Sequence, residues 1–203
     1  MKTKTVILLL LFISFADVFF YSCCHCNEEV VEKMYYHKSL SVSNLDNSGA
    51  YITESDAPLL NKNAYGIRIV LERELLASLR PKQVFPMLIQ QANATSCDCI
   101  VPFLYSEREK ITSIHIISVS RFDDQHLENS DITPYFRTYD LYQTADEYLA
   151  HLKYEIDRDW DDFKLDLLLM TAPTDSSIKH FKVIIKLSDG RILEQITTGI
   201  SLL

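Results

Sequence analysis

The residues of this chain with the most distinctive chemistry are its five cysteines. The first is Cys23. The other four form two C-x-C pairs, Cys24 with Cys26 and Cys97 with Cys99. Thiolates at close spacing can bind a metal ion or form disulfides. Structural zinc sites usually separate paired cysteines by about two to four residues, so the tighter C-x-C spacing makes zinc the weaker alternative.

Disulfides between the two pairs are the favoured interpretation. A bridge within one C-x-C pair would be strained, because an extended tripeptide holds the two sulfurs too far apart. Bridges from Cys24 and Cys26 to Cys97 and Cys99 avoid that strain, and they suit the oxidising compartment that an exported protein meets. They would close a loop of about 70 residues and so restrict the unfolded chain. Free thiols and a metal site at the same four cysteines remain open.

The start of the chain predicts export. Two lysines precede an apolar run over residues 6–20, and Ser22 precedes Cys23. A basic start, a short apolar segment and a small residue at the cleavage point form a secretory signal. Because a cysteine follows the small residue, this segment resembles the bacterial lipoprotein signal, which implies removal of residues 1–22 and attachment of acyl chains such as palmitate to Cys23. Plain secretion and a retained membrane span are the alternatives, but the run is shorter than the roughly 20 residues that a span needs.

The charge of the chain favours contact with the membrane through the lipid and not through the protein body. Residues 1–22 contain two lysines and one aspartate, so their removal reduces 20 basic and 28 acidic residues to 18 and 27, a net charge of −9. An acidic surface opposes binding to nucleic acid and to anionic headgroups. The resemblance to a lipoprotein signal implies an outer membrane lipoprotein, on the periplasmic side or at the cell surface. Residues 23–35 would be its lipid-anchored tether, and residues 36–203 would form a single domain.

One histidine stands beside carboxylates. His126 follows Asp123 and Asp124, and a histidine held by a carboxylate can act as a general base. With a serine nucleophile in reach, this pair would suit a hydrolase. A solvated loop is the commoner context for such residues, and the sequence contains neither G-x-S-x-G nor H-E-x-x-H. We therefore predict no catalytic residue and no cofactor.

A run of acids is the remaining candidate for chemistry. It consists of Asp157, Asp159, Asp161 and Asp162. Alternating aspartates are typical of the first ligands of a calcium loop, but the glycine that should come next is replaced by Asp162. A solvated charge run is the favoured interpretation.

Alternating apolar residues predict that most of the chain is β-strand. The expected strands are residues 36–42, 65–74, 99–105, 110–122, 163–169, 181–187, 192–197 and 200–203. The 110–122 segment is expected to be the longest, with His115 in the core or partly buried. Asp189-Gly190 predicts a tight hairpin turn near the end of the chain.

One helix is predicted over about 144–159. Thr144 and Glu147 form a capping box, and Tyr148, Leu152 and Ile156 share one helical face. About seven short strands and this single connecting helix, without βαβ alternation, predict a mainly β fold. The expected architecture is an antiparallel immunoglobulin-like β-sandwich.

Several segments together resemble a known group of proteins. They are Cys23-Cys24-His25-Cys26, Ala64-Tyr65-Gly66-Ile67-Arg68-Ile69, Ile111-Thr112-Ser113-Ile114-His115-Ile116, Phe122-Asp123, Asp131-Ile132-Thr133 with Phe136, and the Phe181 to Leu203 strands. Their order is similar to that of uncharacterised Bacteroidota lipoproteins of about this length. The resemblance implies a sandwich-like fold and a family without an assigned activity.

The function predicted from these observations is a lipid-anchored, non-catalytic binding or assembly module of the cell envelope. Its eleven tyrosines could offer aromatic surface to a protein or glycan partner. The alternatives are an envelope hydrolase with an unrecognised site, and a metal or redox module built on the two C-x-C pairs.

Overall fold

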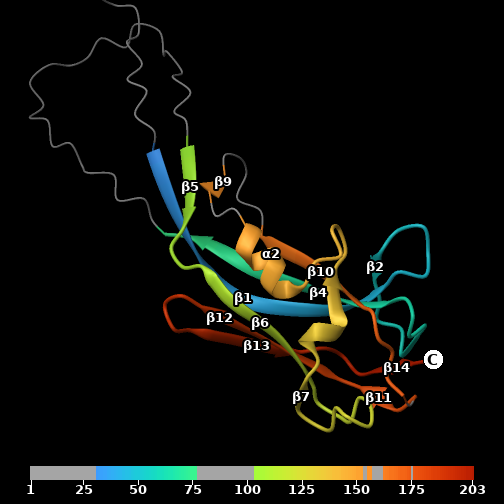
Figure 1. The fold of residues 1–203 in the computed structure, drawn as a ribbon. Helices are drawn as coiled ribbons and strands as arrows, with labels where there is room; N and C mark the ends of the chain where they lie inside the picture. Colours follow the sequence, from blue (N-terminus) through green and yellow to red (C-terminus); the bar gives the residue numbers. More distant parts are fainter. Residues whose placement is uncertain (1–30, 77–102, 153–154, 157–161, 175) are drawn as a thin grey trace, which may run out of the picture. The chain divides into compact units, whose positions relative to one another are not determined.

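The computed structural model describes residues 31–76, 103–152, 155–156, 162–174 and 176–203 (Figure 1). The chain divides into two units. The first consists of Met1–Val31 with Leu79–Phe103, and the second of Glu32–Ser78 with Leu104–Leu203. Nearly all of the first unit lies outside the described residues, so the fold given below is that of the second.

The described part of the chain is built mainly from β-strands. In order they are β1 Val31–Asp46, β2 Thr53–Glu54, β3 Leu59–Leu60, β4 Tyr65–Leu75, β5 Phe103–Glu107, β6 Ile111–Ser118, β7 Ser130–Asp131, the 3₁₀ turn η1 Thr133–Tyr135, β8 Phe136–Thr138, the helix α2 Ala145–His151, β9 Glu155–Ile156, β10 Phe163–Leu169, β11 Ile178–Lys179, β12 Phe181–Leu187, β13 Ile192–Ile196 and β14 Ile200–Leu202.

These strands form three sheets. The first sheet has the order β8-β10-β4-β1-β5-β9, with β2 added to β1. The second sheet has the order β13-β12-β6-β7, and a small third sheet has the order β11-β14-β3. The registered pairs are antiparallel except for β14 with β3, which is parallel. The prediction of a mainly β, antiparallel fold with one connecting α-helix is confirmed for the described residues.

The first and second sheets share one apolar core. In the first sheet, residues that are opposite each other on β4 and β10 point to the same face. Ile69 of β4 and Leu165 of β10 are one such pair. On the second sheet the alternation of β12 buries Val183 and Ile185. All four side chains belong to the same buried cluster. Burial of an aliphatic side chain contributes about 1.5–3 kcal/mol, so this shared core holds the two sheets face to face as a sandwich.

The C-terminal hairpin follows the predicted pattern. β12 and β13 pair from Lys182 with Ile196 to Lys186 with Ile192. Gly190 in the connecting turn has a φ of 89°, a left-handed conformation that glycine adopts without a steric penalty.

The predicted helix is wrong in its second half. α2 ends at His151, and Leu152 already has extended backbone angles. Glu155–Ile156 form strand β9, which pairs with Tyr105 and Ser106 of β5. Acidic residues follow in the sequence, and they would meet the negative end of a longer helix dipole. Strand pairing satisfies the backbone groups here without that penalty.

The strand lengths also differ from the prediction. β1 is the longest described strand, with 16 residues, and it takes in Val31–Tyr35 from the segment predicted as a tether. β6 ends at Ser118 because the chain then turns, and the Ser118 hydroxyl donates to the carbonyl of Ser120 at 2.7 Å. Within the described residues, no helix has both the length and the apolar character needed to cross a bilayer.

Candidate functional site

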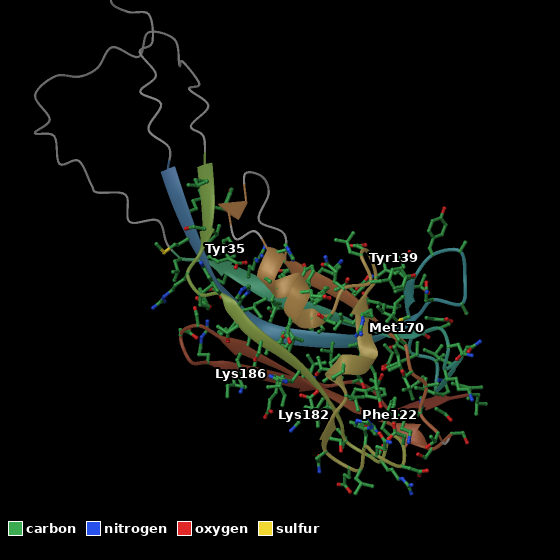
Figure 2. All side chains as sticks on the ribbon, in the orientation of Figure 1. Tyr35, Phe122, Tyr139, Met170, Lys182 and Lys186 are labelled. Carbon is green, nitrogen blue, oxygen red and sulfur yellow. The ribbon has the colours of Figure 1, made fainter. Side chains whose placement is uncertain are left out.

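An open cleft lies where three strands of the first sheet meet at one end. β1 and β4 run antiparallel with Asp46 opposite Tyr65, and β4 pairs with β10 through Gly66 opposite Leu168. The end of β1, the start of β4 and the end of β10 therefore converge. The cleft at this point has a volume of about 270 Å³. Met170, labelled in Figure 2, lies at its rim.

The loop between β8 and α2 closes one side of the cleft and presents Tyr142. Thr138 fixes both ends of this loop: its N–H donates to the carbonyl of Gln143 at 2.9 Å, and its own carbonyl accepts from the N–H of Tyr142 at 3.0 Å. Tyr142 has a φ of 53°, a left-handed conformation that disfavours non-glycine residues by about 1–3 kcal/mol. Its side chain nevertheless remains 58% exposed. The strained backbone therefore holds an aromatic ring at the solvent edge of the cleft.

Polar residues from the ends of β1 and β4 also line the cleft. Asn47, Lys62 and Asn63 all contribute to its wall. Their backbone is fixed: the N–H of Asn47 donates to Ala64 at 2.8 Å, and the N–H of Asn63 donates to the Asn61 carboxamide at 2.9 Å. Two asparagines and one lysine consequently line the same cleft as the exposed Tyr142 and Met170. This combination suits a ligand with hydroxyl or carbonyl groups and one apolar face.

Tyr65 belongs to the lining of the cleft, but its side chain packs in the sandwich core. Tyr65 is fully buried, and its ring lies 5.3 Å from that of Phe181 in the second sheet. Its hydroxyl donates to Asn44 at 2.7 Å. These contacts anchor the start of β4, which lines the cleft, in the sandwich core.

A second hollow of about 230 Å³ lies on the other side of the same loop. Tyr139, labelled in Figure 2, and Asp166 contribute to its lining. The Asp166 carboxylate accepts two hydrogen bonds from the Arg68 guanidinium, at 2.7 and 2.6 Å. This bidentate pair occupies the carboxylate, so the second hollow offers less free hydrogen-bonding capacity than the first.

The structure brings together His126 and Asp123 as the sequence suggested, but in a turn. Asp123 Oδ1 accepts from the backbone N–H of His126 at 2.7 Å and lies 2.9 Å from Nδ1 of its ring. Burial acts to raise the pKa of Asp123, but the hydrogen bonds from His126 outweigh it and lower that pKa. The Tyr135 hydroxyl lies 3.3 Å from the same ring nitrogen. Among the described residues, no serine hydroxyl is bonded to this imidazole, so the geometry is that of a stabilised loop.

His115 is partly buried, which is one of the two placements, core or partly buried, that the sequence predicted. Its Nδ1 lies 2.9 Å from Asp131 Oδ2, and its side chain is 38% exposed. The other oxygen of Asp131 accepts from the Thr133 hydroxyl and backbone N–H, and Thr133 in turn accepts from the N–H of Ile116 at 2.7 Å. These bonds tie β6 to the β7–η1 segment.

A buried lysine gives a pairing that the sequence reasoning missed. Lys179 is fully buried, and its ammonium group donates to the Ser177 hydroxyl at 3.0 Å and to the carbonyl of Arg121. Serine–lysine pairs act as nucleophile and base in some hydrolases. Here the same Lys179 nitrogen also donates to the carbonyl of Arg121. The pair therefore ties β11 to the chain that follows β6.

The most unusual electrostatic feature is a buried ion cluster at the junction of β1, β4 and β5. It consists of Tyr35, His37, Arg73, Glu107, Glu109 and Arg191. Arg73 and Glu107 form an ion pair at 2.6 Å, with side chains only 7% and 3% exposed. Glu109 accepts from the backbone N–H of His37 at 2.9 Å and also pairs with Arg191. Each carboxylate thus has one guanidinium partner, which offsets part of the large desolvation penalty.

His37 is the member of the cluster whose ring is least satisfied. Its side chain is 1% exposed, and within the described part of the chain neither ring nitrogen has a hydrogen-bond partner. Burial, together with the positive charges of Arg73 and Arg191, lowers the pKa of His37 to about 4. Burial and the Glu107 carboxylate raise the pKa of Tyr35, and burial raises that of Glu107 despite its Arg73 partner. At neutral pH both His37 and Tyr35 are therefore uncharged.

The sequence carried a signal for this cluster. Arg73 continues the inward alternation of Ile67, Ile69 and Leu71 along β4, so its side chain begins on the core side. The other predicted site residues lie elsewhere. All five cysteines and Asp157, Asp159 and Asp161 are outside the described residues, while Asp162 is exposed and accepts from the backbone N–H of Arg73 at 2.9 Å. The described residues contain no group of three or more potential ligands arranged to hold a metal ion.

Comparison with known proteins gives one match. A family described as a domain of unknown function (DUF5034) matches residues 37–198. That range includes the cleft, most of the buried ion cluster and most of the strands, but it leaves out Tyr35, the start of β1 and strand β14. No curated protein and no solved structure matches the chain.

Proposed function

The chain belongs to the DUF5034 family, and we propose that it is a lipid-anchored, non-catalytic binding module of the cell envelope, whose ligand occupies the cleft beside Tyr142. The single observation that carries this proposal is the exposed Tyr142, which has a strained backbone and lines the same cleft as two asparagines and a lysine. Strained backbone of this kind clusters at binding and active sites.

The chemistry of the cleft supports a carbohydrate as the ligand class. Sugar rings combine hydroxyl groups with an apolar face of C–H bonds. Asn47 and Asn63 supply donors and acceptors for hydroxyls, while Tyr142 supplies a flat ring for the apolar face. At about 270 Å³, the cleft is slightly smaller than the roughly 300–1,000 Å³ of sites for drug-sized ligands. It therefore suits the end of a glycan chain better than a large compact molecule.

The envelope location rests on the sequence. The basic start, the apolar run over residues 6–20 and the Ser22-Cys23 junction support export followed by acylation. Two or more acyl chains make membrane anchoring stable, since each buried CH₂ contributes about 0.8 kcal/mol. The Bacteroidota resemblance belongs to the same proposal. Metabolic labelling with an alkyne analogue of palmitate should mark the protein, and the substitution Cys23→Ala should remove the label, whereas Cys24→Ala should retain it.

The binding proposal is tested with an array of neutral and acidic oligosaccharides, followed by calorimetric titration of the best binder. Replacement Tyr142→Ala should weaken its binding about tenfold, equivalent to about 1.4 kcal/mol, because the stacking surface is removed. Tyr51→Ala is the matched control, since Tyr51 is 81% exposed and lies outside the cleft lining. Absence of any binder on the array, or equal losses in the two variants, would refute the assignment of the cleft.

The hydrolase alternative would have to use Asp123 and His126. Their described contacts supply only the Tyr135 hydroxyl, which leaves binding as the better-supported function. The metal or redox alternative rests on Cys24, Cys26, Cys97 and Cys99, outside the described residues. Thiol counting with metal analysis of the purified protein tests it directly.

A further inference from the structure

The free edge of the second sheet is formed by β13. Within the described residues, β13 pairs with β12 on one side and with no strand on the other. With five residues it is longer than the other strands that end a described sheet, namely β7, β8, β9, β11 and β3. Long exposed edges are unusual because they invite another strand to pair.

The backbone groups that β13 presents at this edge can be identified. The N–H of Thr197 donates to Phe181 and the N–H of Leu187 donates to Arg191, each at 2.9 Å. Hydrogen-bonded pairs in an antiparallel ladder recur at every second residue. Leu193 and Gln195 therefore bond inward to β12. The N–H and C=O groups of the residues between them, Ile192, Glu194 and Ile196, point away from the sheet.

The side chains of these three residues form a pattern of their own. They are opposite Lys186, Ile184 and Lys182 of β12, whose side chains lie on the outer face of the sheet, and Figure 2 labels the two lysines. Ile192 and Ile196 are 57% and 49% exposed. The edge thus reads apolar, acidic, apolar, and it carries unpaired backbone donors and acceptors in the same positions.

We propose that β13 is a docking edge for an extended segment of a partner protein whose outward side chains read apolar, basic, apolar. Such a segment would add to the sheet as an antiparallel strand. Its two apolar side chains would cover Ile192 and Ile196, and its basic side chain would lie opposite Glu194. Opposite charges across a strand pair contribute up to about 1 kcal/mol. Lys182 lies only 3.9 Å from Glu194, but that exposed pair is weak and leaves the carboxylate open to a second cation.

Charge argues against a second copy of this chain as the occupant. Antiparallel pairing of two β13 strands that matches Ile192 with Ile196 places Glu194 directly opposite its own copy. Like charges in that position are destabilising, and a chain with 28 acidic and 20 basic residues repels itself. A partner strand with a central lysine or arginine has neither disadvantage. The edge is built from β12 and β13, whereas the cleft is built from β1, β4 and β10, so this inference stands independently of the proposed ligand.

The test uses two synthetic nonapeptides with blocked termini. Their central residue is lysine in one peptide and glutamate in the other. Threonine and valine alternate on each side of it, with the valines two residues away on the same face as the central residue. Binding to the isotope-labelled full chain is followed by NMR and amide hydrogen exchange. The lysine peptide should slow exchange at Ile192, Glu194 and Ile196 and should bind about fivefold more tightly than the glutamate peptide. Equal affinity for the two peptides, or no added protection at these three amides, would overturn the proposal.

Two variants test backbone pairing and charge. Glu194→Pro removes the carboxylate and an outward N–H but no bond to β12, so the sheet should stay intact while binding of the lysine peptide falls at least fivefold, about the effect of one lost hydrogen bond, and the preference between the two peptides disappears. Should that variant fail to fold, Glu194→Lys serves instead and should reverse the preference between the peptides. Glu128→Lys, an exposed change outside the sheet, is the matched control and should leave the preference unchanged. A concentration-dependent dimer that Glu194→Pro abolishes would identify a second copy as the occupant and overturn the proposal.

Discussion

The buried His37 predicts a loss of stability in mild acid, with a size that follows from its surroundings. In the unfolded chain this imidazole has its ordinary pKa of 6.5, and in the folded protein burial and the nearby Arg73 and Arg191 charges lower it to about 4. The unfolded chain therefore binds more protons between these two values. Stability is fully present above pH 6.5 and is lost as the pH falls toward 4.

The magnitude comes from this difference in pKa. Each pKa unit corresponds to about 1.36 kcal/mol, so the full contribution of His37 is roughly 3 kcal/mol. About 2 kcal/mol of it should be lost between pH 7 and pH 5. Glu107 acts in the opposite direction, because burial raises its pKa in the folded protein and its protonation then favours folding as the pH falls. A comparison that cancels Glu107 is therefore needed.

The substitution His37→Gln supplies that comparison, since glutamine is uncharged throughout this range and retains a polar side chain. Urea unfolding followed by circular dichroism gives the free energy of unfolding of both proteins from pH 7.5 to pH 4.5. The natural protein should lose about 2 kcal/mol more than the variant between pH 7 and pH 5. A difference between the two proteins that does not change with pH would refute the reasoning. So would a His37 resonance that titrates near pH 6.5 in the folded state.

Two further predictions concern stability at neutral pH. Arg73→Gln should lower the free energy of unfolding, measured in urea, by about 3–5 kcal/mol, because Glu107 is left charged and unpaired in the interior. The double variant Arg73→Met with Glu107→Leu should recover most of this loss. No recovery would contradict the assignment of the pair. Thr144→Ala should lower the free energy of unfolding by about 1 kcal/mol, because it removes a capping box. The Thr144 hydroxyl accepts from the N–H of Glu147, and the Glu147 carboxylate accepts from the N–H of Thr144 at 2.8 Å. A change within experimental error would show that α2 is held by packing alone.

Local pattern was enough to predict most of the strands. The alternation of Ile67, Ile69 and Leu71 predicted β4, and Asp189-Gly190 predicted the C-terminal hairpin, because both signals lie within a few adjacent residues. The end of the helix could not be found in this way. Tyr148, Leu152 and Ile156 have helical spacing, yet the pairing of β9 with β5 depends on a strand about fifty residues earlier in the chain.

The cleft and the buried ion cluster were beyond local pattern for a related reason. Sequence reasoning places charged residues at the surface, and Arg73 and Glu107 are buried only because each neutralises the other across 34 residues of sequence. Glycine or asparagine at a position would have predicted a left-handed backbone, but a tyrosine such as Tyr142 does not. Its position becomes meaningful only when the ends of β1, β4 and β10 are brought beside it.

A chain of buried and partly buried hydrogen bonds fixes the strand ends that line the cleft. The Tyr65 hydroxyl donates to Asn44 Oδ1, and the Asn44 carboxamide donates to the Thr198 hydroxyl at 2.8 Å and to the Thr198 carbonyl at 3.2 Å. This one side chain joins three distant parts of the chain: the start of β4, the end of β1 and the connection between β13 and β14. Hydrogen-bond networks of this kind are rigid, and a rigid site loses little conformational entropy when a ligand binds. The same bonds that complete the sandwich therefore also prepare the cleft for recognition.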